Sequence, residues 1–507
     1  MRKVGRWIAM SLAKPVGLPV LALLALAIGV SMTWLDTNIV NIAIPTIMGA
    51  FGVGINRVEW IFTVYILTMA VAMPLSRWLG EELGYRRLFM IAVGLFTVGS
   101  LMAGASWNIY SMIVFRAIQG FGGGIIMPVA MTLLFRVVPR QKIGTAMGIW
   151  SVVLMVAPTI APVLGGYLVE YWSWRFIFYI NLPVCILTLI LVEMLVPKDA
   201  KTSAGIFDFP GFITAAGGLF ALLFAISEGQ TYGWTSEPII LSFYLAMALL
   251  ILFVAIEMKH KNPLLDLRVF GSAQFTIANL LGVVQVLGFY SSVFYVPIFL
   301  QDIQHMTSMQ AGMILFVPAV VSGVISPISG RIYDRFGPQI VIIPGLVVIG
   351  IFTYMLHFIQ IAISDAAIEI WLAGCYLGLG LVMTPMISSA MAHIPPQHSG
   401  TANTLFSIVR SASASFGLAM LNVMLLNDEA NYMSSMRGYY TPGSHATVAA
   451  QMAAHTAQLP QAMLSNIYQI IQTNALVQSI DNIFLFVSAM AFAAIFLAVF
   501  LRRKVHS

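Results

Sequence analysis

Long apolar runs, separated by short polar loops, dominate the chain from residue 18 almost to its last residue. A helix needs about 20 apolar residues to cross the hydrocarbon core of a bilayer. Fourteen runs meet this length, and the first is long enough that we expect it to tilt or to continue past the membrane. They lie near residues 18–47, 58–79, 87–106, 109–134, 143–169, 175–196, 209–229, 238–257, 274–300, 310–330, 339–360, 367–391, 400–425 and 481–501.

Three stretches outside these runs are polar enough to need their own interpretation. Residues 1–17 carry four basic side chains, but the apolar run that follows is too long for a signal peptide, so we interpret it as a retained first span. Residues 258–272 form a basic internal loop. Residues 426–480 are polar and compatible with helix, and we predict a short helical hairpin there on the outer surface.

The distribution of Lys and Arg predicts the orientation. If the chain starts inside and alternates, 20 of its 25 basic residues fall in cytoplasmic segments. Only Arg57, Arg175 and Arg437 fall outside, while Arg116 and Arg410 lie within spans. Because basic residues concentrate in cytoplasmic loops, this bias predicts an even number of spans with both termini in the cytoplasm. No organelle signal is visible, so we expect a bacterial plasma membrane.

Composition supports an integral membrane protein and excludes several other classes. Hydrophobic residues make up 60% of the 507 residues and charged residues 9%, whereas soluble proteins contain about 25% charged residues. A soluble enzyme, a disordered chain, a nucleic-acid binder and a disulfide scaffold are therefore excluded. Cys185 and Cys375 both lie in apolar runs, and no Cys or His spacing predicts a metal site or a cofactor. Without a phosphate-binding P-loop, ATP is not expected to drive transport.

Two loops share a charge pattern that indicates an internal repeat. In each, an acidic residue precedes a Gly by three positions and basic residues lie close by. The loops are Arg77-Trp-Leu-Gly-Glu81-Glu82-Leu-Gly84-Tyr-Arg86-Arg87, after the second run, and Gly330-Arg331-Ile-Tyr-Asp334-Arg335-Phe-Gly337, after the tenth. Transporters built of two six-helix halves repeat after six spans, so the eight spans here indicate an inserted pair, most simply spans seven and eight.

The second loop resembles the G-x-x-x-D-R-x-G signature of the major facilitator superfamily, and the first is a weaker copy with Arg77 and Glu81 in place of Gly and Asp. Four further stretches resemble motifs of its fourteen-helix drug:proton antiporters, the EmrB/QacA type. They are Leu35-Asp36-Thr-Asn-Ile-Val-Asn41-Ile-Ala-Ile-Pro45, Arg116-Ala-Ile-Gln119-Gly120, Ala157-Pro158-Thr-Ile-Ala-Pro162-Val-Leu-Gly165-Gly166 and Trp174-Arg175-Phe-Ile-Phe-Tyr-Ile-Asn181-Leu-Pro183.

This resemblance covers nearly the whole chain and implies an all-α integral membrane protein with the major facilitator fold. We expect two six-helix bundles facing each other around a central cavity, with two added helices at the side. The corresponding divisions are a cytoplasmic segment at 1–17, an N-terminal bundle at 18–197, the inserted pair at 198–258 and a C-terminal bundle at 259–507.

Asp36 is the first candidate for coupling, because it lies deep in the first span. A carboxylate there costs about 2.5–3.5 kcal/mol on insertion scales, so we expect it to face a water-filled cavity. In such a cavity it can bind a proton and an organic cation in turn. The alternative is a helix contact with Asn38 or Asn41.

Arg116 is the second candidate, and we expect it in the outer half of the fourth span with Gln119 on the same helix face. The resemblance implies a role in proton coupling. The alternative is a structural anchor that binds backbone carbonyls or extends to the interface. Glu228, at the outer end of span seven, is the reserve candidate for a second acid, with an interfacial position as its alternative. Arg410, in span thirteen, is a candidate internal counter-charge.

Two further sets of residues are candidates for mechanical roles. In span five, Pro158 and Pro162 should bend the helix, and Gly165 and Gly166 should admit a neighbouring helix, which together would seal one side of the pathway. Ordinary helix packing is the alternative. The repeated loops should hold the cytoplasmic face closed. Asp334 should accept hydrogen bonds from a helix N-terminus or from an Arg of the other half. The alternative is that the loop charges are solvated. The latch candidates are Glu81, Gly84, Arg86, Arg87, Gly330, Asp334, Arg335 and Gly337.

These features predict a proton-coupled secondary exporter of hydrophobic, often cationic drugs that works by alternating access. The alternatives are an exporter of an endogenous metabolite or lipid, an uptake permease, or a membrane-embedded enzyme, for which no nucleophile or metal set is evident. Expected partners are protons, small hydrophobic or cationic substrates and membrane lipids. The resemblance also permits a periplasmic adaptor protein to dock on residues 426–480.

Overall fold

The computed structural model describes residues 17–139, 142–198, 207–260, 263–361, 363–392, 394–395, 398–440 and 461–501. Every regular element in these ranges is a helix. The N-terminal half contains α2 (Gly17–Phe51), α3 (Ile55–Val58), α4 (Trp60–Ala72), α5 (Leu75–Leu83), α6 (Tyr85–Gly104), α7 (Ile109–Val137), α8 (Ile143–Tyr171), α9 (Phe176–Tyr179) and α10 (Asn181–Leu195). The basic segment before Gly17 lies outside the described residues.

The rest of the chain follows the same all-helical pattern. Its elements are α11 (Phe209–Tyr232), α12 (Glu237–Lys259), the 3₁₀ turn η2 (Leu267–Gly271), α13 (Ala273–Tyr290), the π turn η3 (Ser291–Tyr295), α14 (Val296–Ile298), the π turn η4 (Phe299–Ile303), α15 (Ser308–Phe336), α16 (Gln339–Leu356), α17 (Asp365–Ala392), α18 (Ser399–Tyr440) and α20 (Gln461–Ala498).

The helices account for a multi-pass membrane protein. Among the described residues, 12 helices are long and apolar enough to cross a membrane, and α4 with α5, which meet at an angle of 56°, meet the same criteria when taken together. The remaining expected span, near 143–169, corresponds to α8, in which Ile143–Leu154 is the part that forms a shorter apolar helix by the same criteria. The total of fourteen spans therefore stays a prediction, although a helix occupies each of the fourteen expected positions.

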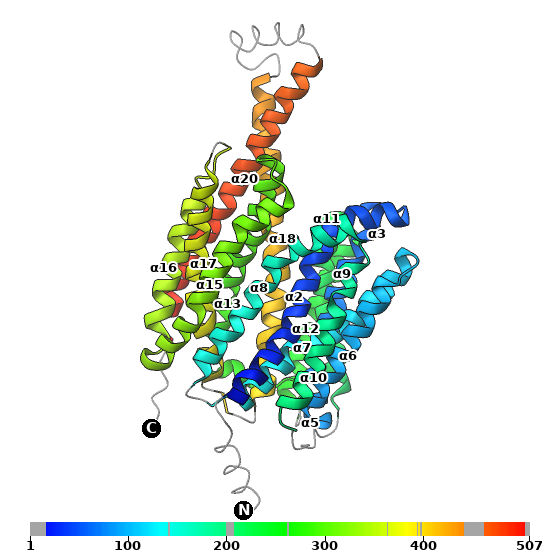
Figure 1. Ribbon diagram of the computed structural model, residues 1–507, viewed down its shortest axis with the longest axis vertical. Coiled ribbons are helices and arrows are strands. Elements are labelled where there is room, and N and C mark those ends of the chain that lie inside the picture. The colour runs from blue at the N-terminus through cyan, green and yellow to red at the C-terminus, as the bar shows by residue number, and fades with distance from the viewer. Residues whose placement is uncertain are drawn as a thin grey trace, which may run out of the picture.

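Two groups of helices lie side by side (Figure 1). The first contains α2 to α10 and the second α13 to α17 with α20, while α8 and α18 run between them. Helix α8 packs on α2 in one group and on α15 in the other, and α18 packs on both α7 and α13. The central contacts between the halves are therefore made by one long helix from each.

The inserted pair α11 and α12 lies beside this junction. Helix α11 packs on α4 of the first group and on α18, and its Leu219 and Leu223 share a small buried cluster with Leu67 and Ala70. Only 17% of the apolar window of α12 is buried, so this helix presents its side chains to the lipid. The pair thus lies at the side of the two bundles, and α11 covers part of the seam between them.

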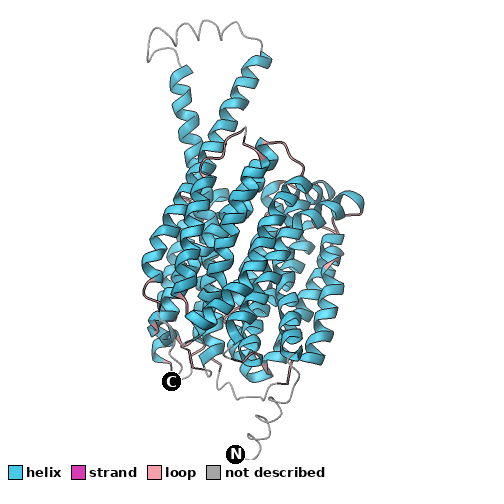
Figure 2. Cartoon of the chain, turned by 60° about the vertical axis from the view of Figure 1, so that its left-hand side comes forward, coloured by secondary structure: helices cyan, strands magenta, loops and turns pink. Residues whose placement is uncertain are grey.

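The predicted hairpin is built differently from expectation. Helices α18 and α20 continue beyond the other helices as two projecting arms, so the hairpin arms are extensions of two spans (Figures 1 and 2). The amide of Asn482 of α20 donates to the Asp428 carboxylate of α18 at 3.0 Å and so joins the two helices. Residues 441–460 lie outside the described ranges. We call this the hairpin end of the molecule, and the opposite end, where α5 meets α6, the latch end.

Candidate functional site

Asp36 lies at the centre of a buried polar cluster between α2, α7 and α10. Its side chain is 0% exposed and accepts from three residues. One Asp36 oxygen accepts from Nη1 of Arg116 at 2.5 Å, and the other accepts from Nε2 of Gln119 and Nδ2 of Asn181, both at 2.9 Å. A buried carboxylate with a cationic partner and two amide donors is well satisfied.

The guanidinium of Arg116 is held on several sides. Its Nη1 also donates to Gln119 Oε1 at 2.8 Å, and its Nε donates to the carbonyl of Ile61 at 3.2 Å. The ring of Tyr65 lies beneath it, with 4.1 Å between the guanidinium carbon and the ring centroid. Arg116 is 0% exposed, and its Nη2 is buried without a hydrogen-bond partner in the described structure. It therefore both pairs with an acid and anchors a backbone carbonyl.

The expectation that Asp36 faces a water-filled cavity is wrong for this structure. The central cavity, of about 150 Å³, is lined by its neighbours on α2, Thr33, Trp34, Thr37 and Asn38, and Asp36 is not among the lining residues. Successive residues on a helix point about 100° apart, so residues 33, 34, 37 and 38 share one face while Asp36 points into the bundle. An organic cation in the cavity therefore does not contact this carboxylate here.

The cavity lies between the two halves, with α11 contributing to one side. Its wall combines aromatic rings, aliphatic and methionine side chains and small hydroxyl or amide groups, and Arg410 of α18 is its charged residue. The remaining lining residues are Tyr65, Ile66, Met69, Ala70, Met73, Met127, Leu223, Val286, Tyr290, Phe294, Ser411, Ala414 and Ser415. The chain passes from α13 into the π turn η3 beside the cavity, and π turns inside helices are frequent at functional sites.

Glu228 lies within α11 and not at a solvent-facing span end. It is 2% exposed, and Thr63 of α4 donates to its Oε1 at 3.0 Å. Glu228 lies one turn before the end of α11 and does not line the central cavity, so its interfacial position and its role as a second acid both stay predictions. Its contact joins the inserted pair to the same helix whose Ile61 carbonyl holds Arg116.

Asp334 joins the two halves at the latch end. Its carboxylate accepts from the backbone N–H groups of Gly144 and Thr145 at 3.1 and 3.2 Å, and from the Thr145 hydroxyl at 3.2 Å. These groups form the first turn of α8, so the acid occupies a helix N-terminus, where a negative charge is stabilised. Of the two partners expected from the sequence, the structure has the helix N-terminus.

The backbones of α8 and α15 are also in close contact beside Asp334. A Cβ at Gly144 would lie 2.5 Å from the carbonyl oxygen of Gly330, and one at Gly148 would lie 2.6 Å from that of Ser326. Gly337 ends α15 with a φ of +91°, a conformation that side chains strain. The halves are thus closed against each other at this end, while Arg335 points to solvent.

The first repeated loop has the same backbone turn but different contacts. Gly84 joins α5 to α6 with a φ of +88°, matching Gly337. Glu81, however, pairs with Arg77 of its own helix at 3.1 Å and not with a helix N-terminus as Asp334 does. Arg77 Nη1 instead donates to the carbonyls of Pro263 and Leu264, which lead into the C-terminal bundle, at 2.8 and 3.3 Å.

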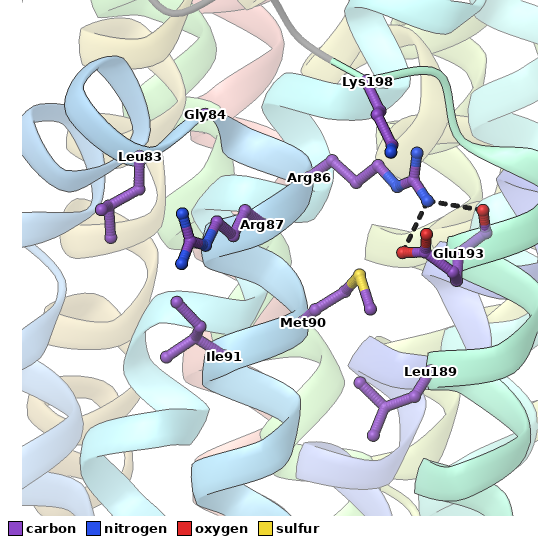
Figure 3. A pocket seen from close by; sticks show the side chains of 9 residues that line it. All are labelled: Leu83, Gly84, Arg86, Arg87, Met90, Ile91, Leu189, Glu193 and Lys198. Atoms are coloured by element: carbon purple, nitrogen blue, oxygen red, sulfur yellow. Dashed lines mark hydrogen bonds and ion pairs between the residues drawn. The ribbon is translucent and has the colours of Figure 1, made fainter.

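Arg86 and Arg87 line an open groove of about 540 Å³ between α6 and α10 (Figure 3). Arg86 points toward Glu193, whose carboxylate lies 2.6 Å away, and also donates to the Glu193 carbonyl, whereas Arg87 points away from it. Glu193 is therefore the structural partner of Arg86 across the groove. Lys198 and the apolar Met90, Ile91 and Leu189 complete the groove.

The span-five motif forms part of one continuous helix, α8. A Cβ at Gly165 would lie 2.8 Å from Cγ1 of Ile39, so this glycine admits α2. Gly166 has nothing within 4 Å of such a Cβ, and its predicted close contact is wrong. The backbone is helical through Pro158 and Pro162, whose side chains lie outside the described structure.

Sequence reasoning did not assign Asn181 and Ser100 to the site. Asn181 donates to Asp36 and, at 3.0 Å, to the hydroxyl of Ser100, which in turn donates to the Phe178 carbonyl at 2.9 Å. The available signal was an amide side chain near the start of the mainly apolar run Phe176–Leu195. Within the described residues no cluster of His, Cys, Asp or Glu can hold a metal ion.

Comparison with known proteins agrees with this architecture. Residues 26–418 match the family model of the Major Facilitator Superfamily. The chain is 29% identical to the uncharacterized MFS-type transporter YhcA of Bacillus subtilis (strain 168), over 96% of this chain and 93% of that protein. It is 32% identical to multidrug resistance protein Stp of Mycobacterium tuberculosis (strain CDC 1551 / Oshkosh), over 80% and 75% of the two chains.

A solved structure shares the fold at low sequence identity. The proton:xylose symporter XylE superimposes with a TM-score of 0.64 at 12% identity, covering 96% of this chain and 97% of the other. The sequence match over most of the chain and the shared fold lead to one conclusion: the chain belongs to the Major Facilitator Superfamily, and it is a membrane transporter and not an enzyme.

Proposed function

We propose that this transporter is a proton-coupled exporter of hydrophobic drug-like compounds across the plasma membrane, with Asp36 as the group that carries the proton. The observation that carries the proposal is the buried cluster of Asp36, Arg116, Gln119 and Asn181, in which every donor to the carboxylate comes from another helix. A relative named as a multidrug resistance protein supports the drug substrates.

Protonation of Asp36 would change how three helices hold each other. The ionised carboxylate draws Arg116 and Gln119 of α7 and Asn181 of α10 toward α2. A proton removes the charge that Arg116 pairs with and weakens the charge-assisted bonds, which are about twice as strong as neutral ones. Because the opposite face of α2 lines the central cavity, a change in how α2 is held alters the cavity. Proton binding and substrate binding are then linked reciprocally.

Export by alternating access requires contacts between the halves that can open and close, and the contacts of α15 with the N-terminus of α8, which we call the latch, are such a set. The halves are in close contact at the latch end, through Asp334 on the α8 N-terminus and through Gly144 against Gly330. If the basic loops are cytoplasmic, as the distribution of Lys and Arg predicts, this conformation is closed to the cytoplasm. Separation of α8 from α15 would open the cavity inward, a rigid-body motion of one bundle against the other. The membrane potential would contribute about 2.3 kcal/mol per proton per 100 mV.

The test is counterflow of protons and substrate in proteoliposomes. The full chain is reconstituted, a pH gradient is imposed, and uptake of ethidium and of a neutral fluorescent dye is followed together with proton flux. Asp36→Asn should abolish both the acceleration by the gradient and the proton flux. Asp365→Asn, the same change at an exposed position in the first turn of α17, should leave both intact. Normal gradient-driven transport by Asp36→Asn would overturn the assignment of the proton to this residue.

A further inference from the structure

We propose that the central cavity selects amphipathic anions, compounds with an aromatic body and one acidic group, and that Arg410 recognises their negative charge. This inference rests on the proposed function to the extent that it takes the cavity to be the transport site. It replaces the cationic preference that the sequence predicted, because that preference required Asp36 to face the cavity.

The charge balance of the cavity wall carries the inference. Arg410 is the charged residue among the lining residues, and no carboxylate of the described structure lines the cavity with it. Its Nε and Nη1 atoms are buried and have no hydrogen-bond partner in the described structure. A charge inside a membrane protein normally pairs with a counter-charge or with backbone carbonyls. A bound anion would supply the partner that the wall lacks.

The second arginine within the spans shows what a satisfied guanidinium looks like in this chain. Arg116 has a carboxylate, an amide and a carbonyl as acceptors. Arg410 has instead the ring of Trp34, with 5.7 Å between the guanidinium carbon and the ring. A cation over an aromatic face is stabilised but keeps its full charge. Arg410 is therefore available to an anion in a way that Arg116 is not.

The other side of Arg410 offers only neutral groups. It borders a small void of about 10 Å³ between α13, α17 and α18, together with Asn279, whose Oδ1 is also buried without a partner in the described structure. The amide oxygen is neutral and accepts no hydrogen bond from Arg410 in the described structure, so it does not offset the guanidinium charge. Neither the void nor the cavity therefore supplies a counter-charge for Arg410 among the described residues.

The remaining wall fits an aromatic body. Trp34, Tyr65, Tyr290 and Phe294 line the cavity, and the rings of Tyr290 and Phe294 lie 5.6 Å apart. A volume of about 150 Å³ is the size at which an apolar cavity holds a single benzene ring, so a one-ring aryl acid fits this conformation. Binding of a two-ring acid such as 2-naphthoate requires the halves to separate around the cavity. The hydroxyls of Thr33, Thr37 and Ser411 can share the acidic group with Arg410.

Charge selectivity is measured by binding, which does not depend on transport. Purified full-length protein is titrated with three ligands that share one ring system: 2-naphthoate, 2-naphthylmethanol and 2-naphthylmethylammonium. We expect the anion to bind at least tenfold more tightly than the neutral alcohol, and the cation most weakly. A cation that binds as tightly as the anion, or more tightly, would overturn the inference.

Variants of Arg410 test whether this residue sets the preference. Arg410→Gln should reduce the preference for the anion over the alcohol to less than twofold, while binding of the alcohol stays within threefold of the unmodified protein. Arg410→Lys should retain part of the preference because it keeps the charge. If the glutamine variant does not fold, the ratio of anion to alcohol binding is measured with the lysine variant. Ser411→Ala, which lines the same cavity without charge, is the matched control and should keep the order of the three ligands.

Transport measurements separate the failure of this inference from failure of the proposed function. Exchange of one anion for one proton moves two charges across the membrane, so 2-naphthoate flux should rise when a potassium–valinomycin potential is imposed. Arg410-dependent anion binding without any gradient-driven flux would sustain the inference and refute proton-coupled export. Gradient-driven flux of ethidium that Arg410→Gln leaves unchanged, with no flux of 2-naphthoate, would sustain export and refute the inference.

Discussion

Neutralising Asp334 should release the latch that holds the two halves together. In Asp334→Asn the side chain keeps its size but loses its negative charge. The carboxylate now accepts three hydrogen bonds at the start of α8, two from the backbone of Gly144 and Thr145 and one from the Thr145 hydroxyl. The asparagine has one acceptor oxygen, and its NH₂ group faces N–H donors that it cannot bind.

The size of the effect follows from these contacts. A hydrogen bond to a charged group contributes about 1.5–3 kcal/mol and a neutral one about 0.5–1.5 kcal/mol. A negative charge at a helix N-terminus adds about 0.3–1 kcal/mol. Because Asp334 is only half-buried, we take a loss of about 2 kcal/mol, which corresponds to a factor of about 30 in the equilibrium between closed and open latch. An open state populated at about 1% would then rise to about a fifth.

The measurement is the distance between the two halves at the latch end. Nitroxide labels at Lys142 and Arg331, both exposed, report the separation of α8 from α15 by pulsed electron resonance. Cys185 and Cys375 are both free and buried, and each is replaced by Ala before labelling. Asp334→Asn should transfer population to a longer distance.

Two comparisons make the result specific. Thr145→Val removes only the hydroxyl bond, which we take as about 1 kcal/mol because its acceptor is half-buried, and should shift the equilibrium about fivefold. Asp365→Asn removes an exposed charge at another helix start and should change nothing. The reasoning is refuted if Asp334→Asn leaves the distance distribution unchanged, or if Asp365→Asn shifts it by the same amount.

Three other substitutions test contacts elsewhere in the chain. Asn181→Ala removes one donor from the buried carboxylate and should lower the free energy of unfolding by about 1–3 kcal/mol, seen as a lower melting temperature in detergent. Gly165→Leu should destabilise by at least about 1–3 kcal/mol because α2 lies against it, while Gly166→Leu, facing open space, should melt like the unmodified protein. Glu228→Gln keeps an acceptor for Thr63, so melting and the pH dependence of transport should both stay unchanged; a lost pH dependence would identify Glu228 as a second proton carrier.

The membrane architecture was largely predictable from the sequence because lipid imposes one rule on every span. Each segment must be apolar and about 20 residues long, and this rule located helices at all fourteen expected positions. The repeat was predictable for a similar local reason. An acid three residues before a Gly marked both Gly84 and Gly337, and both adopt the positive φ that ends one helix and begins the next.

Which way a buried side chain points was not predictable in the same manner. A span that is apolar on every side gives no signal for the face that packs inward, so the sequence located Asp36 along α2 but not around it. The partners of a buried acid come from distant parts of the chain: Arg116 is 80 residues away and Asn181 is 145. Their meeting depends on how α2, α7 and α10 pack, which periodicity does not encode.

The two faces of α2 separate the residue that we propose carries the proton from the cavity that we propose binds the substrate. A carboxylate inside the cavity would form an ion pair with any cationic substrate, so the proton and the cation would compete directly for one site. Here Asp36 is buried and does not line the cavity, whereas Arg410 is the charged residue that lines it. Driving force and charge preference should then be separable. Asp36→Asn should remove the dependence of transport on the pH gradient while 2-naphthoate remains the best ligand, and Arg410→Gln should remove that preference while the pH dependence remains. A single substitution that abolishes both would show that one site serves both roles.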